Sequence, residues 1–227
     1  MGPMASALFY EILTEMTPAE KDQDHIETVI LSDPLVPDRT AAILSEDERD
    51  RMAVEKRIAR DIAVLKQAGC TELVVTCNTS HFFLDRMGSA VPLPVVHLIG
   101  ETVEAVKTLD GNSAGNGPVA VLATDGTIRT RIYQNALEAE DMEAWLPDAS
   151  CQKMVMSVIY DYVKRGKPVP LELWKSIDER VHEAGCRNAI LGCTELSVLK
   201  KDLELDSHYV DPLVIAALRV IEHAHCQ

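Results

Sequence analysis

The sequence lacks several features that would assign a function at once. None of its six cysteines forms a Cys-x-x-Cys pair, which excludes a zinc ribbon and a thioredoxin-type redox centre. It contains no apolar run long enough to span a bilayer and no recognisable signal peptide. We therefore expect a cytoplasmic protein with no membrane partner, whose cysteines are thiols in a reducing compartment.

Positive charge is also scarce. The chain of 227 residues has 22 Lys and Arg against 36 Asp and Glu, which gives a formal net charge of −14. This balance argues against nucleic acid or an anionic membrane as a partner. An anionic substrate would need cationic groups placed close to it, so each well-positioned Arg or Lys gains weight.

Two stretches of the chain repeat one another without a gap, residues 68–79 and residues 184–195. Each reads Ala-Gly-Cys, then six residues, then a second Cys followed by small polar residues. A helical run ends at Gly69 or Gly185, where glycine suits the left-handed cap. The short apolar run that follows is typical of a buried parallel strand. Each repeat therefore predicts a helix, a strand and a second helix.

The second cysteines of the repeat, Cys77 and Cys193, stand between strand and helix. A lone cysteine there is most often a small buried hydrophobe. Two matched cysteines at carboxyl ends of strands, where α/β sheets bind ligands and the helix dipole favours thiolate, indicate a site. Facing each other across a cleft, one as thiolate could remove a proton from carbon and the other as thiol could return one to the opposite face. Fixed donors near Asn78, Thr79 and Thr194 would stabilise the carbanion, and no redox or metal cofactor is required.

Strands and helices alternate along the chain, which predicts an α/β fold with a mainly parallel sheet. The length allows one large α/β domain or two small lobes. Besides the strands before the two cysteines, we expect strands over residues 26–31, 92–98, 118–123 and 142–146. We expect helices over residues 5–16, 45–68, 101–109, 124–137, 154–163, 171–184 and 213–223. The helix over 45–68 begins at a capping box and directs four apolar residues inward, Met52, Ile58, Ile62 and Leu65.

Three further residues and one turn could belong to a site or have an ordinary structural explanation. Arg39 follows a loop stiffened by two prolines, after the strand over 26–31, and is either a site residue or an exposed surface Arg. Lys164 stands at a helix C-terminus, where the dipole favours any cation. His81 is either a ligand or base, or a histidine with a structural role. The turn 124–127 is an anion-receptive nest, but it lacks the P-loop pattern and its Lys, so we do not expect nucleotide phosphate.

Two motifs, Cys77-Asn78-Thr79-Ser80-His81 and Gly192-Cys193-Thr194-Glu195-Leu196, resemble the paired motifs of the aspartate/glutamate racemase superfamily. The second motif differs from the Gly-Cys-Thr-His pattern expected of dedicated glutamate racemases. The resemblance covers essentially the whole chain. Further matches follow the aspartate racemase branch, namely Met1-Gly2-Pro3, Pro37-Asp38-Arg39-Thr40, Ala123-Thr124-Asp125-Gly126-Thr127 and Lys164-x-Gly166.

The resemblance implies a PLP-independent amino-acid racemase acting on aspartate, without a cofactor, with Cys77 and Cys193 as the acid–base pair. It implies that Arg39 and Lys164 grip the substrate carboxylates. It also implies a homodimer and a site lined by Met1, Asn78, Thr79, Thr124 and Thr194. The alternatives are a racemase or isomerase for another small acid (glutamate, hydantoin or maleate), or a truncated, non-catalytic relative that only binds a ligand.

The resemblance also predicts how the chain divides. Two pseudo-symmetric lobes are expected, residues 1–97 with 205–227 carrying Cys77, and residues 98–204 carrying Cys193. The active site would lie between them. The family begins with an apolar strand leading into Gly-Gly-Met-Gly-Pro, whereas this sequence starts at that Met. We therefore expect the first strand of the first sheet to be missing.

Overall fold

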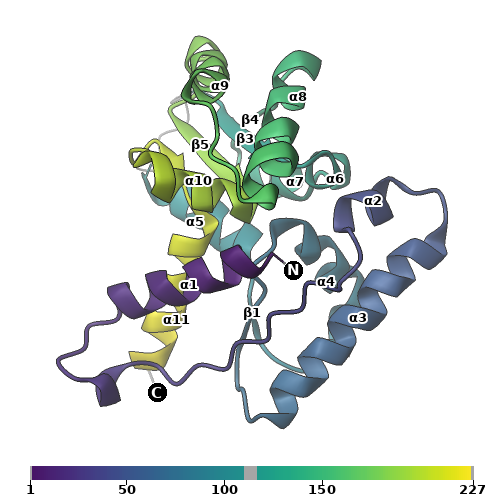
Figure 1. Cartoon of the computed structure of the whole chain (residues 1–227), viewed down its shortest axis with the longest axis vertical. Coiled ribbons are helices and arrows are strands. Elements are labelled where there is room, and N and C mark those ends of the chain that lie inside the picture. The colour runs from purple at the N-terminus through teal and green to yellow at the C-terminus, as the bar shows by residue number, and fades with distance from the viewer. Residues whose placement is uncertain (1, 110–116, 226–227) are drawn as a thin grey trace.

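A computed structural model describes residues 2–109 and 117–225 of the chain (Figure 1). Its strands form two separate sheets. One has two strands in the order β1-β2, and the other has four in the order β4-β3-β5-β6. Every strand pair is parallel. The expected α/β fold, with mainly parallel sheets flanked by helices, is confirmed.

The four-stranded sheet is centred on two fully paired strands. In it, β3 (Val119–Ala123) pairs with β5 (Asn188–Gly192) along its whole length. The short strands β4 (Ala144–Trp145) and β6 (Tyr209–Val210) flank this pair. Almost every residue of the central pair is buried, which is why both read as continuous apolar runs.

Helices cover both faces of this sheet, and alternate residues of β3 divide between them. Ala120 and Leu122 pack in one apolar cluster, whereas Val119, Val121 and Ala123 pack in the other, as the twofold period of a strand requires. The first cluster is completed by α8 (Ala149–Ser157), α9 (Leu171–Glu183) and α10 (Thr194–Leu203). The second is completed by α5 (Leu98–Leu109) and α7 (Ile132–Glu138), which follows α6 (Asp125–Thr130). Beyond α8 the chain continues through a π-helical turn, Val158–Tyr162, and a 3₁₀ turn, Val163–Arg165.

The two-stranded sheet pairs β1 (Leu73–Val74) with β2 (Val95–Val96). Apolar residues of α3 (Glu48–Gln67) and α4 (His81–Met87) pack against β1. Apolar residues of α1 (Pro3–Met16) and α11 (Pro212–His225) pack against β2. The remaining helix, α2 (Arg39–Leu44), leads into α3.

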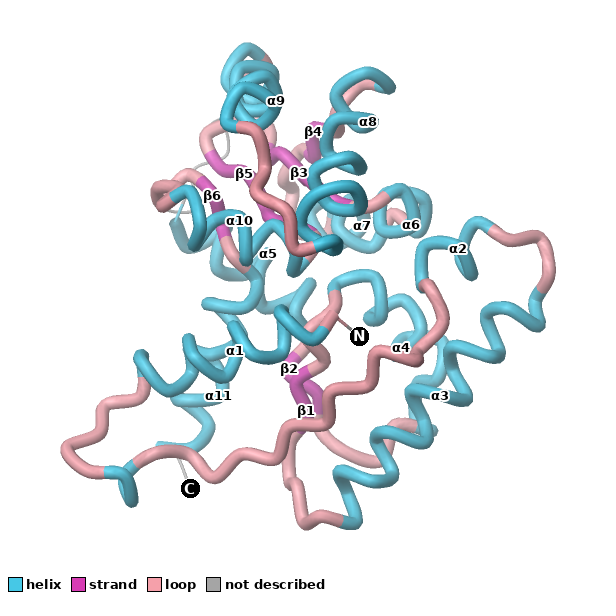
Figure 2. The backbone as a smooth tube through the Cα atoms, viewed as in Figure 1, coloured by secondary structure: helices cyan, strands magenta, loops and turns pink. Residues whose placement is uncertain are grey.

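The strand predicted over residues 26–31 is wrong. This segment belongs to no sheet and its residues 27–30 are exposed. A cavity of about 640 Å³ separates it from β1, so its backbone has no strand to pair with. Figure 2 shows it as part of the long loop that runs from α1 to α2 past the small sheet. The expectation that the first strand of the first sheet is missing stays a prediction.

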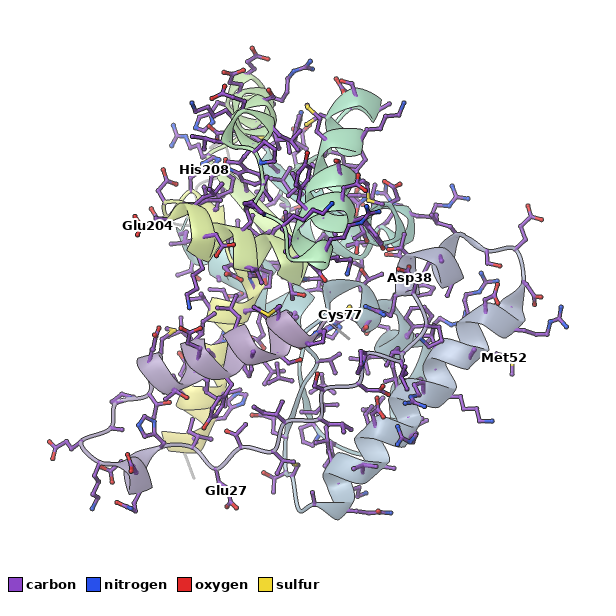
Figure 3. All side chains as sticks on the ribbon, viewed as in Figure 1. Glu27, Asp38, Met52, Cys77, Glu204 and His208 are labelled. Atoms are coloured by element: carbon purple, nitrogen blue, oxygen red, sulfur yellow. The ribbon has the colours of Figure 1, made fainter. Side chains whose placement is uncertain are left out.

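Two details predicted for α3 are also wrong. The N-cap is Asp47, whose side chain accepts a hydrogen bond from the Arg49 N–H, because Ser45 is already used to end α2. Met52 is 57% exposed and points outward in Figure 3, whereas Ile58 and Ile62 are buried. Six residues before Ile58, Met52 lies about 120° away around the helix.

The expected lobe boundaries stay a prediction. Within residues 205–227, β6 pairs with β5 of the four-stranded sheet, whereas α11 packs against α1 and α5. The end of the chain therefore contacts both halves of the molecule. No helix in the described part of the chain combines the length and apolar character needed to cross a membrane.

The two glycines of the repeat adopt the predicted left-handed conformation. Gly69 has a φ of 92° after α3 and Gly185 has a φ of 73° after α9. No atom lies within 4 Å of the position that a Cβ would take at Gly185, so only the backbone requires glycine there.

We expect Gly185→Ala to destabilise the protein by about 1 kcal/mol, because a Cβ is disfavoured at positive φ. Thermal unfolding should show a midpoint lower by about 2–4 °C. The matched control is Gly100→Ala in α5, a position with no positive φ, where alanine should leave the midpoint unchanged or raise it. Equal midpoints for Gly185→Ala and the unmodified chain would contradict this account of the turn.

Candidate active site

The second cysteines of the repeat line one small cavity. Cys77 follows β1 and Cys193 follows β5, and both line a space of about 20 Å³. Such a volume holds about one water molecule. Figure 3 shows Cys77 between the upper and lower halves of the molecule, near the start of α1.

Most of the predicted site residues line this cavity. The predicted residues that line it are Arg39, Cys77, Thr79, Thr124, Lys164, Cys193 and Thr194. Asn78 follows Cys77 in the sequence and is buried, but it does not line the cavity. Met1 lies outside the described residues. Sequence reasoning missed six lining residues, Gly2, Asp38, Thr40, Thr76, Tyr160 and Glu195.

Arg39 is held beside Cys77 by the preceding loop. It is the first residue of α2, and its Nη1 donates to the carbonyls of Val36, at 3.2 Å, and Pro37, at 3.0 Å. Burial alone would lower the pKa of Arg39, but its charge attraction and hydrogen bond to Cys77 outweigh burial and raise it. The Arg39 Nε is buried and has no hydrogen-bond partner among the described residues. One guanidinium donor therefore remains free for a ligand.

Cys193 has the opposite electrostatic environment. The residue is 6% exposed, and its thiol donates to Glu195 Oε2 at 2.9 Å. Burial, followed by the negative charge of Glu195, raises the pKa of Cys193 well above its ordinary value, and nearby Lys164 offsets only part of this. These two effects outweigh the preference of the α10 N-terminus for a thiolate. Cys193 is a protonated thiol at neutral pH.

Glu195 connects the thiol to Lys164. The Lys164 Nζ donates to Glu195 Oε1 at 2.5 Å. Burial would raise the pKa of Glu195, but Lys164 and the Cys193 thiol outweigh burial and lower it. Burial would lower the pKa of Lys164, but Glu195 and the cysteines raise it. Both groups are therefore charged, and Lys164 is not merely a surface cation at a helix end.

A cluster of threonine hydroxyls joins the two halves of the molecule next to the cavity. Thr40 donates to Thr124 at 3.0 Å, and Thr79 lies 2.8 Å from the hydroxyl of Thr127. Helices α2 and α6 meet closely because residue 126 is glycine, where a Cβ would fall 2.8 Å from the Thr40 Cα. Thr124 also caps α6 by accepting from the Thr127 N–H. That N–H of the proposed anion nest is thus used within the protein.

Asn78 presents a second unpaired donor. The buried Tyr133 hydroxyl donates to Asn78 Oδ1 at 2.6 Å, which fixes the orientation of the amide. Burial raises the pKa of Tyr133 far above its ordinary value, so the phenol remains a donor. In the described chain, the Asn78 Nδ2 has no hydrogen-bond partner although it is buried. Buried donors without partners are costly, so Asn78 and Arg39 are both suited to an acceptor-rich ligand.

His81 has a structural role. Its Nε2 accepts from the Leu98 N–H at 2.9 Å, so Nδ1 carries the proton and donates to the Cys77 carbonyl at 3.2 Å. Burial, and then the neighbouring His97, lower the pKa of His81 to about 3. The neutral imidazole ties the backbone of Cys77 to the start of α5. Of the two interpretations of His81, the structural one holds.

The repeat contained a signal for Glu195. In the alignment of the two stretches, Glu195 stands where the first stretch has Thr79, so the polar positions after both cysteines are equivalent. Tyr160 gave no comparable signal. Its ring lies 5.2 Å from the Lys164 Nζ and its hydroxyl donates to Asp38 at 3.2 Å. These contacts depend on the π-helical turn, which local sequence does not indicate.

Comparison with known proteins identifies the family. The family model described as Asp/Glu/Hydantoin racemase matches residues 1–220, so the chain belongs to this racemase family. The structure is similar to that of the Picrophilus torridus aspartate racemase, with 27% identity and a TM-score of 0.82 over 99% of this chain and 90% of that one.

The relatives also include racemases of other stated specificity. The broad specificity amino-acid racemase RacX of Bacillus subtilis is 21% identical over 93% of this chain and 89% of its own length. A glutamate racemase of Deinococcus radiodurans is 29% identical over 73% of this chain, and the match spans 56% of that enzyme. The family is therefore that of racemases, which are isomerases.

The electrostatic effect of Glu195 on Cys193 is testable by pH-dependent alkylation. Replacing the carboxylate in Glu195→Gln removes a negative charge and leaves Lys164 unpaired, so the pKa of Cys193 should fall. The alkylation of Cys193 by iodoacetamide, followed by peptide mass spectrometry, should then begin at a lower pH. The exposed Glu183→Gln serves as the matched control and should leave the profile unchanged. An unchanged Cys193 profile in Glu195→Gln would show that the carboxylate does not control this thiol.

Proposed function

We propose that the protein is a cofactor-independent amino-acid racemase acting on aspartate, with Cys77 and Cys193 as its two acid–base groups. One observation carries this proposal. The two cysteines line the same small cavity, and their charged neighbours differ in sign: the positive Arg39 guanidinium lies beside Cys77 and the negative Glu195 carboxylate beside Cys193. Membership of the racemase family supports the reaction class.

The charges favour one resting state. In one direction of the reaction Cys77, which lies beside the Arg39 guanidinium, is the base. Cys193, protonated and hydrogen-bonded to Glu195, is then the acid. A two-base inversion needs one thiol that gives a proton and one sulfur that accepts one.

The chemical step balances without any added reactant. The Cα–H bond of the substrate breaks as its proton passes to Cys77, and the electron pair stays on Cα, delocalised into the adjacent carboxylate. Cys193 then gives its S–H proton to the opposite face of Cα and becomes a thiolate. Lys164, which already interacts with Glu195, limits the repulsion between that thiolate and the carboxylate. The reverse direction exchanges the two roles.

The donors around the cavity support a dicarboxylate substrate. Arg39 lines the cavity with a buried N–H that has no partner in the described structure, and Lys164 supplies a cation there. The unpartnered amide N–H of Asn78 lies next to Cys77 in sequence but outside this lining. Because the cavity of about 20 Å³ must open to admit any amino acid, aspartate requires a smaller opening than glutamate. The homodimer, the cytoplasmic location and the absence of a cofactor remain predictions.

We expect Cys77→Ala and Cys193→Ala each to lower racemisation by at least about a hundredfold, the usual contribution of one acid–base group. The assay follows loss of the Cα proton of L-aspartate in D₂O by NMR, without added cofactor, together with formation of D-aspartate. Cys70→Ala, the first cysteine of the same repeat and outside the cavity, is the control and should remain active. A variant of either paired cysteine that keeps more than about a tenth of the activity, a loss below roughly 1.4 kcal/mol, would contradict the two-base mechanism.

The role of Arg39 can be separated from its charge. Arg39→Lys keeps the positive charge but cannot bind the loop carbonyls and a carboxylate at the same time, so kcat/KM for aspartate should fall by about tenfold or more. The matched control is Arg49→Lys, an exposed arginine of α3 that pairs with Asp47, which should leave the kinetics unchanged. Full activity of Arg39→Lys would place the carboxylate contact elsewhere.

A further inference from the structure

One buried tyrosine contacts the chain next to both cysteines of the small cavity. The Tyr133 hydroxyl donates to Asn78 Oδ1 at 2.6 Å, and Asn78 directly follows Cys77 in the sequence. On the other side, a Cβ at Gly192 would lie 3.3 Å from the Tyr133 Cε2, so the ring packs against the residue that directly precedes Cys193. A single side chain therefore connects the segments that carry Cys77 and Cys193.

The Tyr133 side chain is held rigidly in this position. It has an exposed fraction of 0% and packs in the apolar cluster between the four-stranded sheet and helices α5 and α7. Glycine at residue 192 makes room for the ring, since a Cβ there would crowd both Tyr133 and, at 2.9 Å, the Cβ of Ala123. An aromatic side chain has two rotatable bonds, and close packing keeps both in one rotamer. Tyr133 is therefore a spacer of fixed length rather than a flexible link.

An unusual backbone position directs Tyr133 toward Asn78. Helix α6 ends and α7 begins at Arg131, which has a φ of 57° although it is not glycine. In one continuous helix, Thr127 and Tyr133 would lie about 120° apart around the axis. With the break, Thr127 contacts Thr79 at 2.8 Å and Tyr133 binds the adjacent Asn78. Backbone strain of this kind is concentrated at functional sites, and here it brings both side chains onto the turn after Cys77.

The two segments that Tyr133 connects are anchored unequally. Gly192 ends β5, a five-residue strand that pairs with β3 and β6. In the described chain, the two-residue strand β1 before Cys77 pairs only with β2. Cys77 is the N-cap of the 3₁₀ turn Asn78–Ser80, so a movement of Asn78 passes through one planar peptide group to Cys77. Tyr133 thus ties the position of Cys77 to the firmly held end of β5.

We propose that Tyr133 is a positioning residue that sets the separation of the Cys77 and Cys193 sulfur atoms across the cavity. Its ring rests against the end of β5, and its hydroxyl holds the turn that follows Cys77. Acid–base groups must lie within about 0.5 Å of their working positions. This inference rests on the proposed function, because a two-base inversion requires two thiols at a fixed distance on opposite faces of one carbon.

Loss of the hydroxyl should separate two outcomes of the same chemistry. After the Cα–H bond breaks, the proton is on one sulfur and the electron pair is on Cα. Inversion then needs a proton from the sulfur on the opposite face. In D₂O the first thiol exchanges its proton for deuterium, and return of that deuteron to the same face gives labelled substrate of unchanged configuration. A displaced Cys77 therefore impairs inversion more than exchange.

The experiment compares the unmodified chain with Tyr133→Phe, which keeps the ring and removes the hydroxyl. Initial rates are measured with L-aspartate in D₂O, without added cofactor, for deuterium entering L-aspartate and for formation of D-aspartate. We expect formation of D-aspartate to fall by about tenfold and the ratio of exchange to inversion to rise by at least about threefold. A general loss of stability would lower both rates together, so an unchanged ratio would overturn the proposal.

Tyr209→Phe is the matched control. Tyr209 is 4% exposed and its hydroxyl donates to Asp178, but it does not line the small cavity. This variant also removes a hydrogen bond of a buried tyrosine, and it leaves the contacts to Asn78 and Gly192 intact. Both rates and their ratio should stay as in the unmodified chain. An equal change of the ratio in Tyr209→Phe would show a general effect of losing a buried hydroxyl and would overturn the role assigned to Tyr133.

A second readout does not depend on activity. Crystal structures of the three proteins give the distance between the Cys77 and Cys193 Sγ atoms. This distance should change by about 0.5 Å or more in Tyr133→Phe and stay within coordinate error in Tyr209→Phe. Equal distances in all three proteins would overturn the proposal even where racemisation is observed. If the unmodified chain neither exchanges nor racemises aspartate, the proposed function fails, and the distance between the sulfur atoms alone decides whether Tyr133 is a spacer.

Discussion

The buried carboxylate of Glu195 is the interaction on which the rest of the site depends. It accepts a hydrogen bond from the Cys193 thiol and forms an ion pair with Lys164. Glu195 thereby connects α10 to the turn Val163–Arg165 that follows α8. A buried carboxylate without these partners would be strongly disfavoured. Glu195 therefore fixes both the position of the Lys164 ammonium and the protonation of the thiol.

The two halves of the repeat have the same local sequence pattern but opposite electrostatics. Where the second half has Glu195, the first half has Thr79, a neutral residue that joins the threonine cluster instead. The charge beside Cys77 comes from outside the repeat, from Arg39 at the start of α2. The two cysteines of the repeat therefore lie in electrostatic environments of opposite sign.

The sequence predicted the features that depend on neighbouring residues. It failed for the features that depend on contacts between residues distant in the chain. The repeat predicted the strand–cysteine–helix units and the left-handed conformation of Gly69 and Gly185 because each depends on neighbouring residues. Residues 26–31 have a strand-like composition, yet a strand exists only where another strand lies beside it, and there the structure has a cavity. Glu195 was missed as a site residue for a similar reason, since its ion pair with Lys164 spans 31 residues.

The unequal sheets explain why the surroundings of Cys77 are so heavily bonded. Cys193 follows a five-residue strand that is paired on both edges, whereas Cys77 follows a two-residue strand paired on one edge. A thiol in acid–base catalysis must be held within a fraction of an ångström of its working position. Next to Cys77, the hydrogen bond from His81 to its carbonyl and the threonine cluster supply the restraint that the small sheet cannot. The position of Cys77 therefore depends on side-chain hydrogen bonds, and that of Cys193 on a strand that is paired on both edges.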